Sequence, residues 1–211
     1  MSIVHVMRHG QVDNPQGILY ERLPGYHLSE LGRTMTEQAA DFFRPLPISH
    51  LRCSPLERAQ ESMQPIATVF PELSVVTDAR LIEAGNAFAG QVMGSTAQAA
   101  KSPKNWHYLL NPLRPSWGEP YAEIADRMAA AILDAAEVVG ADGQAAIVSH
   151  QLPIWVTRLR AEGRRLWHDP RKRECTLASV TSFHIADGRI GQVEYAEPVG
   201  HLLPNRVQFG F

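Results

Sequence analysis

The sequence predicts an α/β protein: a three-layer αβα sandwich with a mostly parallel sheet, an antiparallel hairpin at one edge and an irregular insertion near residues 84–118. Three observations predict this class. Short apolar runs rich in β-branched residues alternate with longer segments of helical periodicity. Several of these runs end abruptly in charged or polar residues, as strands do where they leave a sheet. Near the carboxyl end, two strand-like runs flank Asp187-Gly188, which is a favoured two-residue hairpin turn.

The amino-terminal half contains three predicted strands and two predicted helices. Ser29 can cap the first helix, whose apolar residues recur at helical spacing until Pro45 stops it. Ser54 is the predicted N-cap of the second helix and Pro55 its first residue, so that Arg58 lies in the first turn. The segment between the first strand and the first helix is predicted to be an ordered loop. The predicted strands are Ile3 to Met7, Ile48 to Cys53 and Leu73 to Thr77.

The carboxyl-terminal half begins with the insertion at residues 84–118. Glycine, proline, asparagine and tryptophan interrupt any periodicity there, and we expect an irregular or short-helical segment that covers the crevice beside the strand ends. No linker or repeat divides the chain, so we expect a single domain over 1–211. The remaining predicted elements are the helix Glu119 to Val139, the strand Ala145 to Ser149, the helix Pro153 to Arg164, and the hairpin strands Ala178 to Ala186 and Arg189 to Tyr195.

Composition and charge exclude several classes of protein. Of the 211 residues, 45% are hydrophobic and 20% charged, which is ordinary for a soluble globular protein. The formal net charge is -2, and the longest basic run, Arg171-Lys172-Arg173, is predicted to be a solvated face, so no affinity for nucleic acid is expected. The two cysteines form no zinc pattern or disulfide framework. Without a leader or a membrane-length apolar run, the chain is expected to be cytoplasmic, with no membrane partner.

Cationic and imidazole side chains gather at the predicted strand exits. Arg8 and His9 follow the first strand, Arg58 follows the second, and His150 comes directly after Ser149. Glu83 lies in a loop after the third strand. In a mostly parallel sheet these positions meet in one crevice. Two guanidinium groups and two imidazoles suit a tetrahedral dianion such as phosphate, and a lone carboxylate among them suits proton transfer.

Five short motifs contain these residues and span about residues 3 to 155. They are Arg8-His9-Gly10 with Asn14, Leu28-Ser29-Glu30-Leu31-Gly32, Cys53-Ser54-Pro55-Leu56-Glu57-Arg58-Ala59, Leu81-Ile82-Glu83, and Val148-Ser149-His150. In kind, order and approximate spacing the set resembles the histidine phosphatase superfamily, in its phosphoglycerate-mutase-like branch. Each motif alone is weak, and the five together are highly specific. Val12 departs from the pattern, because many relatives have a small hydroxyl residue there.

The resemblance implies covalent catalysis through a phosphohistidine. His9 would be the nucleophile, and Glu83 would protonate the leaving oxygen and then deprotonate the attacking water. No metal or other cofactor is implied, since cationic side chains neutralise the phosphate. The nearby arginines should lower the pKa of His9 and keep its imidazole neutral. The phosphoryl oxygens would be held by Arg8, Asn14, Arg58 and His150.

A phosphatase acting on a small phosphorylated metabolite fits better than a mutase. Ala84-Gly85-Asn86 stands where mutases typically continue with a charged and aromatic run that grips the substrate carboxylate, and the insertion has Arg114 alone in place of a paired-arginine segment. Two alternatives stay open: phosphoryl transfer of the phosphoglycerate mutase type, and a non-catalytic module that only binds phosphorylated ligands. A metal site that includes His5 is disfavoured, because the arginines would repel the cation and no metal-binding spacing is present.

The insertion also supplies candidates for contacts with the organic part of the substrate. They are Asn86, Phe88, Trp106 and Arg114. Ordinary packing explains Phe88 and Trp106 equally well, and solvated surface charge is the better explanation for Arg114. Within the first strand, His5 is expected to be a hydrogen-bonded core histidine and not a reagent. The terminal hairpin is either an exposed sheet edge or the seam of a homodimer, and the sequence leaves both open.

Overall fold

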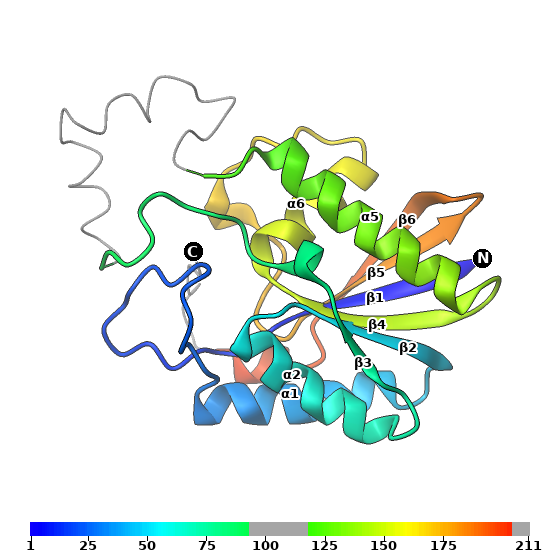
Figure 1. Cartoon of the computed structure of the whole chain (residues 1–211), viewed down its shortest axis with the longest axis horizontal. Helices are drawn as coiled ribbons and strands as arrows, with labels where there is room; N and C mark the ends of the chain where they lie inside the picture. The colour runs from blue at the N-terminus through cyan, green and yellow to red at the C-terminus, as the bar shows by residue number, and fades with distance from the viewer. Residues whose placement is uncertain (93–117, 204–211) are drawn as a thin grey trace.

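The computed structural model describes residues 1–92 and 118–203, and these contain one six-stranded sheet in the order β3-β2-β4-β1-β5-β6. The first four strands in that order run parallel, β5 runs antiparallel to β1, and β6 runs antiparallel to β5. The mostly parallel sheet and its edge hairpin confirm the prediction (Figure 1). The strands are β1 (Ser2–Arg8), β2 (Ile48–Cys53), β3 (Val75–Thr77), β4 (Gln144–Ser149), β5 (Val180–Ala186) and β6 (Arg189–Ala196).

Helices cover both faces of this sheet, as Figure 1 shows: α1 and α2 lie on one face and α5 and α6 on the other. Successive side chains of a strand point to opposite faces of the sheet. In β1, Val4 and Val6 accordingly pack with α5, and Met7 packs with α1 and α2. Each fully buried apolar side chain of this size stabilises the fold by roughly 1.5–3 kcal/mol. The helices are α1 (Glu30–Phe43), α2 (Glu57–Val69), α5 (Tyr121–Val139) and α6 (Gln151–Ala161).

The two predicted N-caps have different outcomes. Ser29 caps α1 as expected, and its hydroxyl accepts a hydrogen bond of 3.0 Å from the backbone N–H of Gly32. Ser54 does not cap α2, so that prediction was wrong: the helix begins at Glu57, and its N-cap makes no side-chain hydrogen bond. The Ser54 hydroxyl lies 2.7 Å from Nε2 of His150 instead. Arg58 is still in the first helical turn.

Backbone conformation explains where other boundaries differ from the prediction. Helix α6 ends at Ala161, before the expected Arg164, and Gly163 follows with a positive φ of 66°. Strand β5 starts at Val180, because Ala178 has a φ of 53° and cannot extend a strand. Asp187 and Gly188 have φ values of 51° and 69°, which fit the two-residue hairpin turn predicted at this position.

The two ends of the predicted insertion lie side by side. Asn86 pairs with Gly118 in an isolated antiparallel bridge, and Ile18 pairs with Val92 in another. A Cβ on Gly118 would lie 2.7 Å from the carbonyl oxygen of Gly85, so the close approach requires glycine. Between these ends, the candidates Trp106 and Arg114 lie outside the described residues.

Two further expectations concern side chains within the layers. His5 is buried and hydrogen-bonded, with Nδ1 2.8 Å from the Ser182 hydroxyl and Nε2 3.0 Å from Oε1 of Gln144, which confirms it as a core histidine. Cys53 and Cys175 are buried and unpaired. Among the described helices, none combines the length and apolar character needed to cross a bilayer.

Candidate active site

The carboxyl ends of three neighbouring strands meet at one level of the sheet. In the register of the sheet, Arg8 of β1 is opposite Ser149 of β4. The residue after β1 continues this pairing, because the N–H of His9 donates to the carbonyl of Ser149 over 3.1 Å. On the other side of β4, the N–H of Ser54 donates to the carbonyl of Val148 over 3.0 Å. His9 and His150 are thereby brought together, with ring centroids 5.1 Å apart.

His9 presents a free imidazole nitrogen. Its Nδ1 lies 2.8 Å from the carbonyl oxygen of Gly10, and a carbonyl can only accept, so Nδ1 carries the proton and Nε2 keeps its lone pair. His9 as a whole is only 2% exposed. Burial, and after it the charges of Arg58 and Arg8, hold the pKa of His9 well below its ordinary value of 6.5. The expected direction is confirmed, although burial is a larger cause than the arginines.

Arg8 and Arg58 are buried, and neither forms an ion pair with a carboxylate of residues 1–92 or 118–203. Arg8 donates from Nη1 to the carbonyl of Cys175 over 2.7 Å, and Arg58 donates from Nη2 to the carbonyl of Glu21 over 2.6 Å. The Arg58 guanidinium also lies over the Tyr20 ring, 4.8 Å from its centroid. These contacts use one nitrogen of each guanidinium. Nε of Arg8 and both Nε and Nη1 of Arg58 are buried with no partner in the structure.

His150 contributes a fourth unpartnered atom. We refer to Arg8, His9, Arg58 and His150 together as the cluster. Its Nε2 is engaged by the Ser54 hydroxyl at 2.7 Å, while its Nδ1 is buried and has no partner. Burial, and then the charge of Arg58, keep the pKa of His150 well below 6.5. Buried polar atoms without partners are rare in folded proteins. Four of them on three neighbouring side chains form a site whose polar atoms an oxyanion would satisfy.

Glu83 is fixed beside the cluster by its backbone. The Ser149 hydroxyl donates to the carbonyl of Leu81 over 2.8 Å, which ties this loop to the end of β4. Arg22 donates from Nε to the carbonyl of Glu83 over 2.6 Å. The carboxyl group is buried and accepts a hydrogen bond of 2.7 Å from the N–H of Ala84. Its charge acts on the pKa of Arg58, so it lies within electrostatic reach of that guanidinium.

The other described candidates, Asn14 and Asn86, each hydrogen-bond within their own loop, and Asn86 also approaches Glu21. Asn14 donates to the carbonyl of Ile18 over 2.8 Å and accepts from its N–H over 2.9 Å, so the phosphate-binding role of this amide stays a prediction. The Asn86 carbonyl oxygen accepts from the N–H of Phe88 over 2.9 Å, and the Phe88 ring is buried.

Glu21 is a site residue that sequence reasoning missed. It is a second buried carboxyl group, 7% exposed, and Asn86 approaches its Oε1 at 3.4 Å. Its φ of 37° is unusual for a residue other than glycine. Burial, and after it the Glu83 charge, raise the pKa of Glu21 to about 8. A single glutamate in an irregular loop carries no sequence signal for such a position.

The basic triplet is only partly a solvated face. Arg171 and Lys172 are exposed as expected, but the prediction was wrong for Arg173, which is half-buried. Arg173 donates from Nε to Nε2 of His168 over 2.9 Å and from Nη1 to Oε1 of Gln151 over 3.2 Å. Its position depends on contacts with α6, which the composition of the triplet could not reveal.

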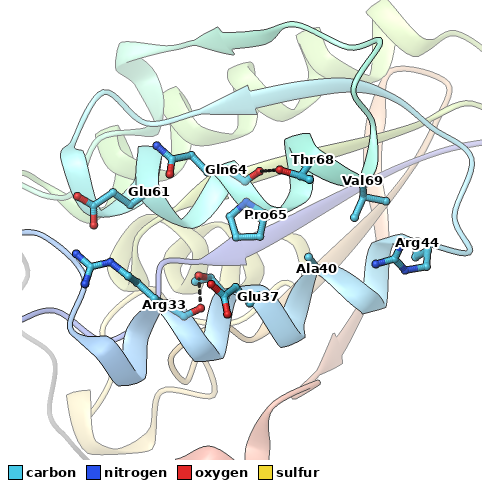
Figure 2. A pocket seen from close by; sticks show the side chains of 10 residues that line it. Arg33, Glu37, Ala40, Arg44, Glu61, Gln64, Pro65, Thr68 and Val69 are labelled. Carbon is cyan, nitrogen blue, oxygen red and sulfur yellow. Dashed lines mark hydrogen bonds between the residues drawn. The ribbon is translucent and has the colours of Figure 1, made fainter.

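A separate open groove lies between α1 and α2, and Figure 2 shows the side chains that line it. Both signs of charge occur there, including Arg33, Glu37 and Glu61. None of the cluster residues described above lines this groove. Across residues 1–92 and 118–203, no group of three or more His, Cys, Asp or Glu side chains is arranged to hold a metal ion.

The chain belongs to the histidine phosphatase superfamily (branch 1), whose family model matches residues 4–197. It is 50% identical over 195 residues to the uncharacterized protein Rv0525 of Mycobacterium tuberculosis, covering 92% of this chain and 96% of that protein. Among solved structures, phosphoserine phosphatase from Entamoeba histolytica in complex with 3-phosphoglyceric acid superposes with a TM-score of 0.75 at 18% identity, covering 96% of this chain and 100% of that one. Mycobacterial glucosyl-3-phosphoglycerate phosphatase Rv2419c gives 0.70 at 22% identity, over 92% and 96% of the two chains.

Proposed function

We propose that this protein is a phosphomonoesterase that hydrolyses a small phosphorylated metabolite through a phosphohistidine on His9. One observation carries the proposal. Four buried nitrogen atoms of Arg8, Arg58 and His150 have no partner, and they belong to the side chains around an imidazole whose Nε2 is unprotonated. A phosphoryl group would accept hydrogen bonds from these nitrogens and react with that Nε2.

The reaction takes two displacements at phosphorus. Nε2 of His9 attacks, the N–P bond forms, and the ester P–O bond breaks while Glu83 protonates the departing oxygen. Glu83 then removes a proton from water, whose oxygen attacks phosphorus and breaks the N–P bond to release inorganic phosphate and neutral His9. Arg8, Arg58 and His150 stabilise the charge on the phosphoryl oxygens in both steps.

This scheme gives the cationic side chains the role that a metal ion has in many phosphatases. We therefore expect activity to survive a chelator. The two structural relatives named above are phosphatases of phosphoserine and of glucosyl-3-phosphoglycerate. Esters of these two kinds are the first compounds to include in a substrate panel.

Hydrolysis of p-nitrophenyl phosphate with EDTA present tests the proposal. The wild type is expected to turn over, and His9→Ala is expected to lose activity by several orders of magnitude while keeping its fold. A wild type that binds phosphate but does not turn over would support the binding-module alternative. Interconversion of 3- and 2-phosphoglycerate in the presence of 2,3-bisphosphoglycerate, at a rate above that of phosphate release, would support the mutase alternative.

A further inference from the structure

One arginine outside the cluster also lacks a carboxylate partner. Eight described arginines are buried or partly buried, and five of them form an ion pair with Asp or Glu. The other three do not. Two of the three, Arg8 and Arg58, belong to the catalytic cluster. The third is Arg173. The paired ones are Arg52, Arg80, Arg127, Arg158 and Arg160.

Neutral groups hold the Arg173 side chain in place. Nδ1 of His168 lies 2.6 Å from the carbonyl oxygen of Leu166, so Nδ1 carries the proton and Nε2 accepts from Nε of Arg173. Gln151 accepts from Nη1. The remaining nitrogen, Nη2, makes no hydrogen bond within the part of the chain that the structure describes. The guanidinium is therefore oriented by two contacts, and it forms no ion pair with any carboxylate of the described residues.

A short hydrogen-bond chain connects Arg173 to the catalytic cluster. Gln151, which accepts from Arg173, donates from Nε2 to the carbonyl of Cys175 over 3.3 Å. The same carbonyl accepts from Nη1 of Arg8 at 2.7 Å. The charges of Glu83 and Arg8 both act on the pKa of Arg173, which places its guanidinium within electrostatic reach of both. Arg173 thus borders the cluster.

We propose that Arg173 binds a second anionic group of the substrate, either a carboxylate or a second phosphate, while Arg8 and Arg58 hold the phosphoryl group that reacts. This inference rests on the proposed phosphomonoesterase function and adds a substrate class to it. Leaving a charge partly desolvated without a counterion is unfavourable, and an anion on the ligand would offset that cost. The planar guanidinium suits either kind of oxyanion.

Two pairs of substrates, each differing by one anionic group, test the proposal. O-phosphoserine and O-phosphoethanolamine differ by a carboxylate, and the bisphosphate and monophosphate of propane-1,3-diol differ by a phosphate. We expect the wild type to prefer the more anionic member of one pair in kcat/KM, by about 10- to 100-fold. Arg173→Gln should reduce that ratio towards one, and Arg173→Lys should retain part of it. The pair that responds identifies the anion.

Arg171→Gln is the matched control, because Arg171 belongs to the same triplet, is exposed and pairs with Asp169. It should leave the ratio unchanged. A wild type without preference in either pair would overturn the inference. So would Arg173→Gln lowering both members of a pair equally, since that would indicate a positioning role through Gln151 and Arg8. If Arg173→Gln does not fold, Arg173→Lys replaces it. A reduced substrate ratio in Arg173→Lys would support anion binding, and an equal loss for both members of a pair would indicate a positioning role.

The failure of this inference is separable from failure of the proposed function. Turnover of p-nitrophenyl phosphate that depends on His9, with substrate ratios insensitive to Arg173, would refute the role of Arg173 alone. Absence of any turnover by the wild type would refute both.

Discussion

At the scale of single residues, the imidazoles of His9 and His150 differ in whether their free nitrogen is a hydrogen-bond acceptor or a donor. The Gly10 carbonyl fixes the proton of His9 on Nδ1, so that His9 presents a lone pair. The Ser54 hydroxyl can donate to Nε2 of His150, and Nδ1 then carries the proton and presents a donor. In the proposed mechanism, one neighbour for each ring thus suits the first to act as a nucleophile and the second to bind an oxyanion.

Ser54→Ala tests this assignment. Without the hydroxyl, Nε2 of His150 loses its partner, and the tautomer with a free Nδ1–H is no longer favoured. We expect kcat/KM for p-nitrophenyl phosphate to fall by about 10- to 100-fold and stability to fall by about 1–3 kcal/mol, because a buried ring nitrogen loses its hydrogen-bond partner. The measurements are steady-state kinetics and urea unfolding.

The protein contains a matched control for this substitution. Ser182 makes the same kind of contact with a histidine, 2.8 Å from Nδ1 of His5, at a core position of the sheet. Ser182→Ala should cost comparable stability and leave kcat/KM close to that of the wild type. Equal losses of activity in the two variants would show that Ser54 acts only through stability.

At the scale of elements, α5 holds the loop that carries Glu83. From this helix Arg127 donates to the carbonyls of Arg80 and Ile82, each over 2.6 Å, and pairs with Glu119 at 2.8 Å. One side chain therefore satisfies several backbone acceptors and fixes the path of the chain into Glu83. In the proposed mechanism, the general acid Glu83 is thus aligned by a helix that contributes no reacting group of its own.

Arg127→Met should disturb this alignment. We expect kcat to fall at least tenfold, and stability to fall by about 2–4 kcal/mol because Glu119 and the carbonyls lose a partly buried partner. Arg160→Met removes an arginine whose partner Asp126 is exposed, and it should cost at most about 1 kcal/mol with kcat unchanged. Similar kcat values for both variants would contradict the role of Arg127.

The elements and the cluster differ in how far the sequence could predict them. Periodicity and turn residues were sufficient for the strands, the Ser29 cap and the hairpin, because these depend on local chemistry. Ser54 was misassigned because its partner, His150, is 96 residues away in the chain. Burial of Glu21 and Arg173 likewise depends on long-range packing. The family motifs included His9, Gly10 and Arg58, whereas nothing local marked Glu21, whose carbonyl accepts from Arg58.

At the scale of the whole molecule, buried ionisable groups link stability to pH. The folded protein holds Glu21 with a pKa of about 8, above the ordinary 4.5. Its contribution to stability is therefore complete below about pH 4.5 and is lost as the pH rises through 8. The buried imidazoles of His9 and His150 act at the other end, because their lowered pKa values cost stability as the pH falls below 6.5.

Glu21→Gln removes the first of these effects. Relative to the wild type, the variant should gain stability between about pH 4.5 and 8, by up to a few kcal/mol, and show a constant difference above that range. The histidine contributions are common to both proteins and cancel in the comparison. Urea unfolding at pH 5.5 and pH 8.5 measures the difference, and an equal difference at both values would contradict the burial of an ionisable Glu21.

The most direct test of the mechanism is to trap the phosphoryl group on the protein. Glu83→Gln should slow the attack of water on the intermediate, while p-nitrophenolate can leave without an acid. Quenching this variant in base during turnover, followed by peptide mass spectrometry, is predicted to find one phosphoryl group on His9 that is lost in acid. Turnover by the wild type with no phosphorylated His9 in either protein, or with the group on another residue, would contradict the account.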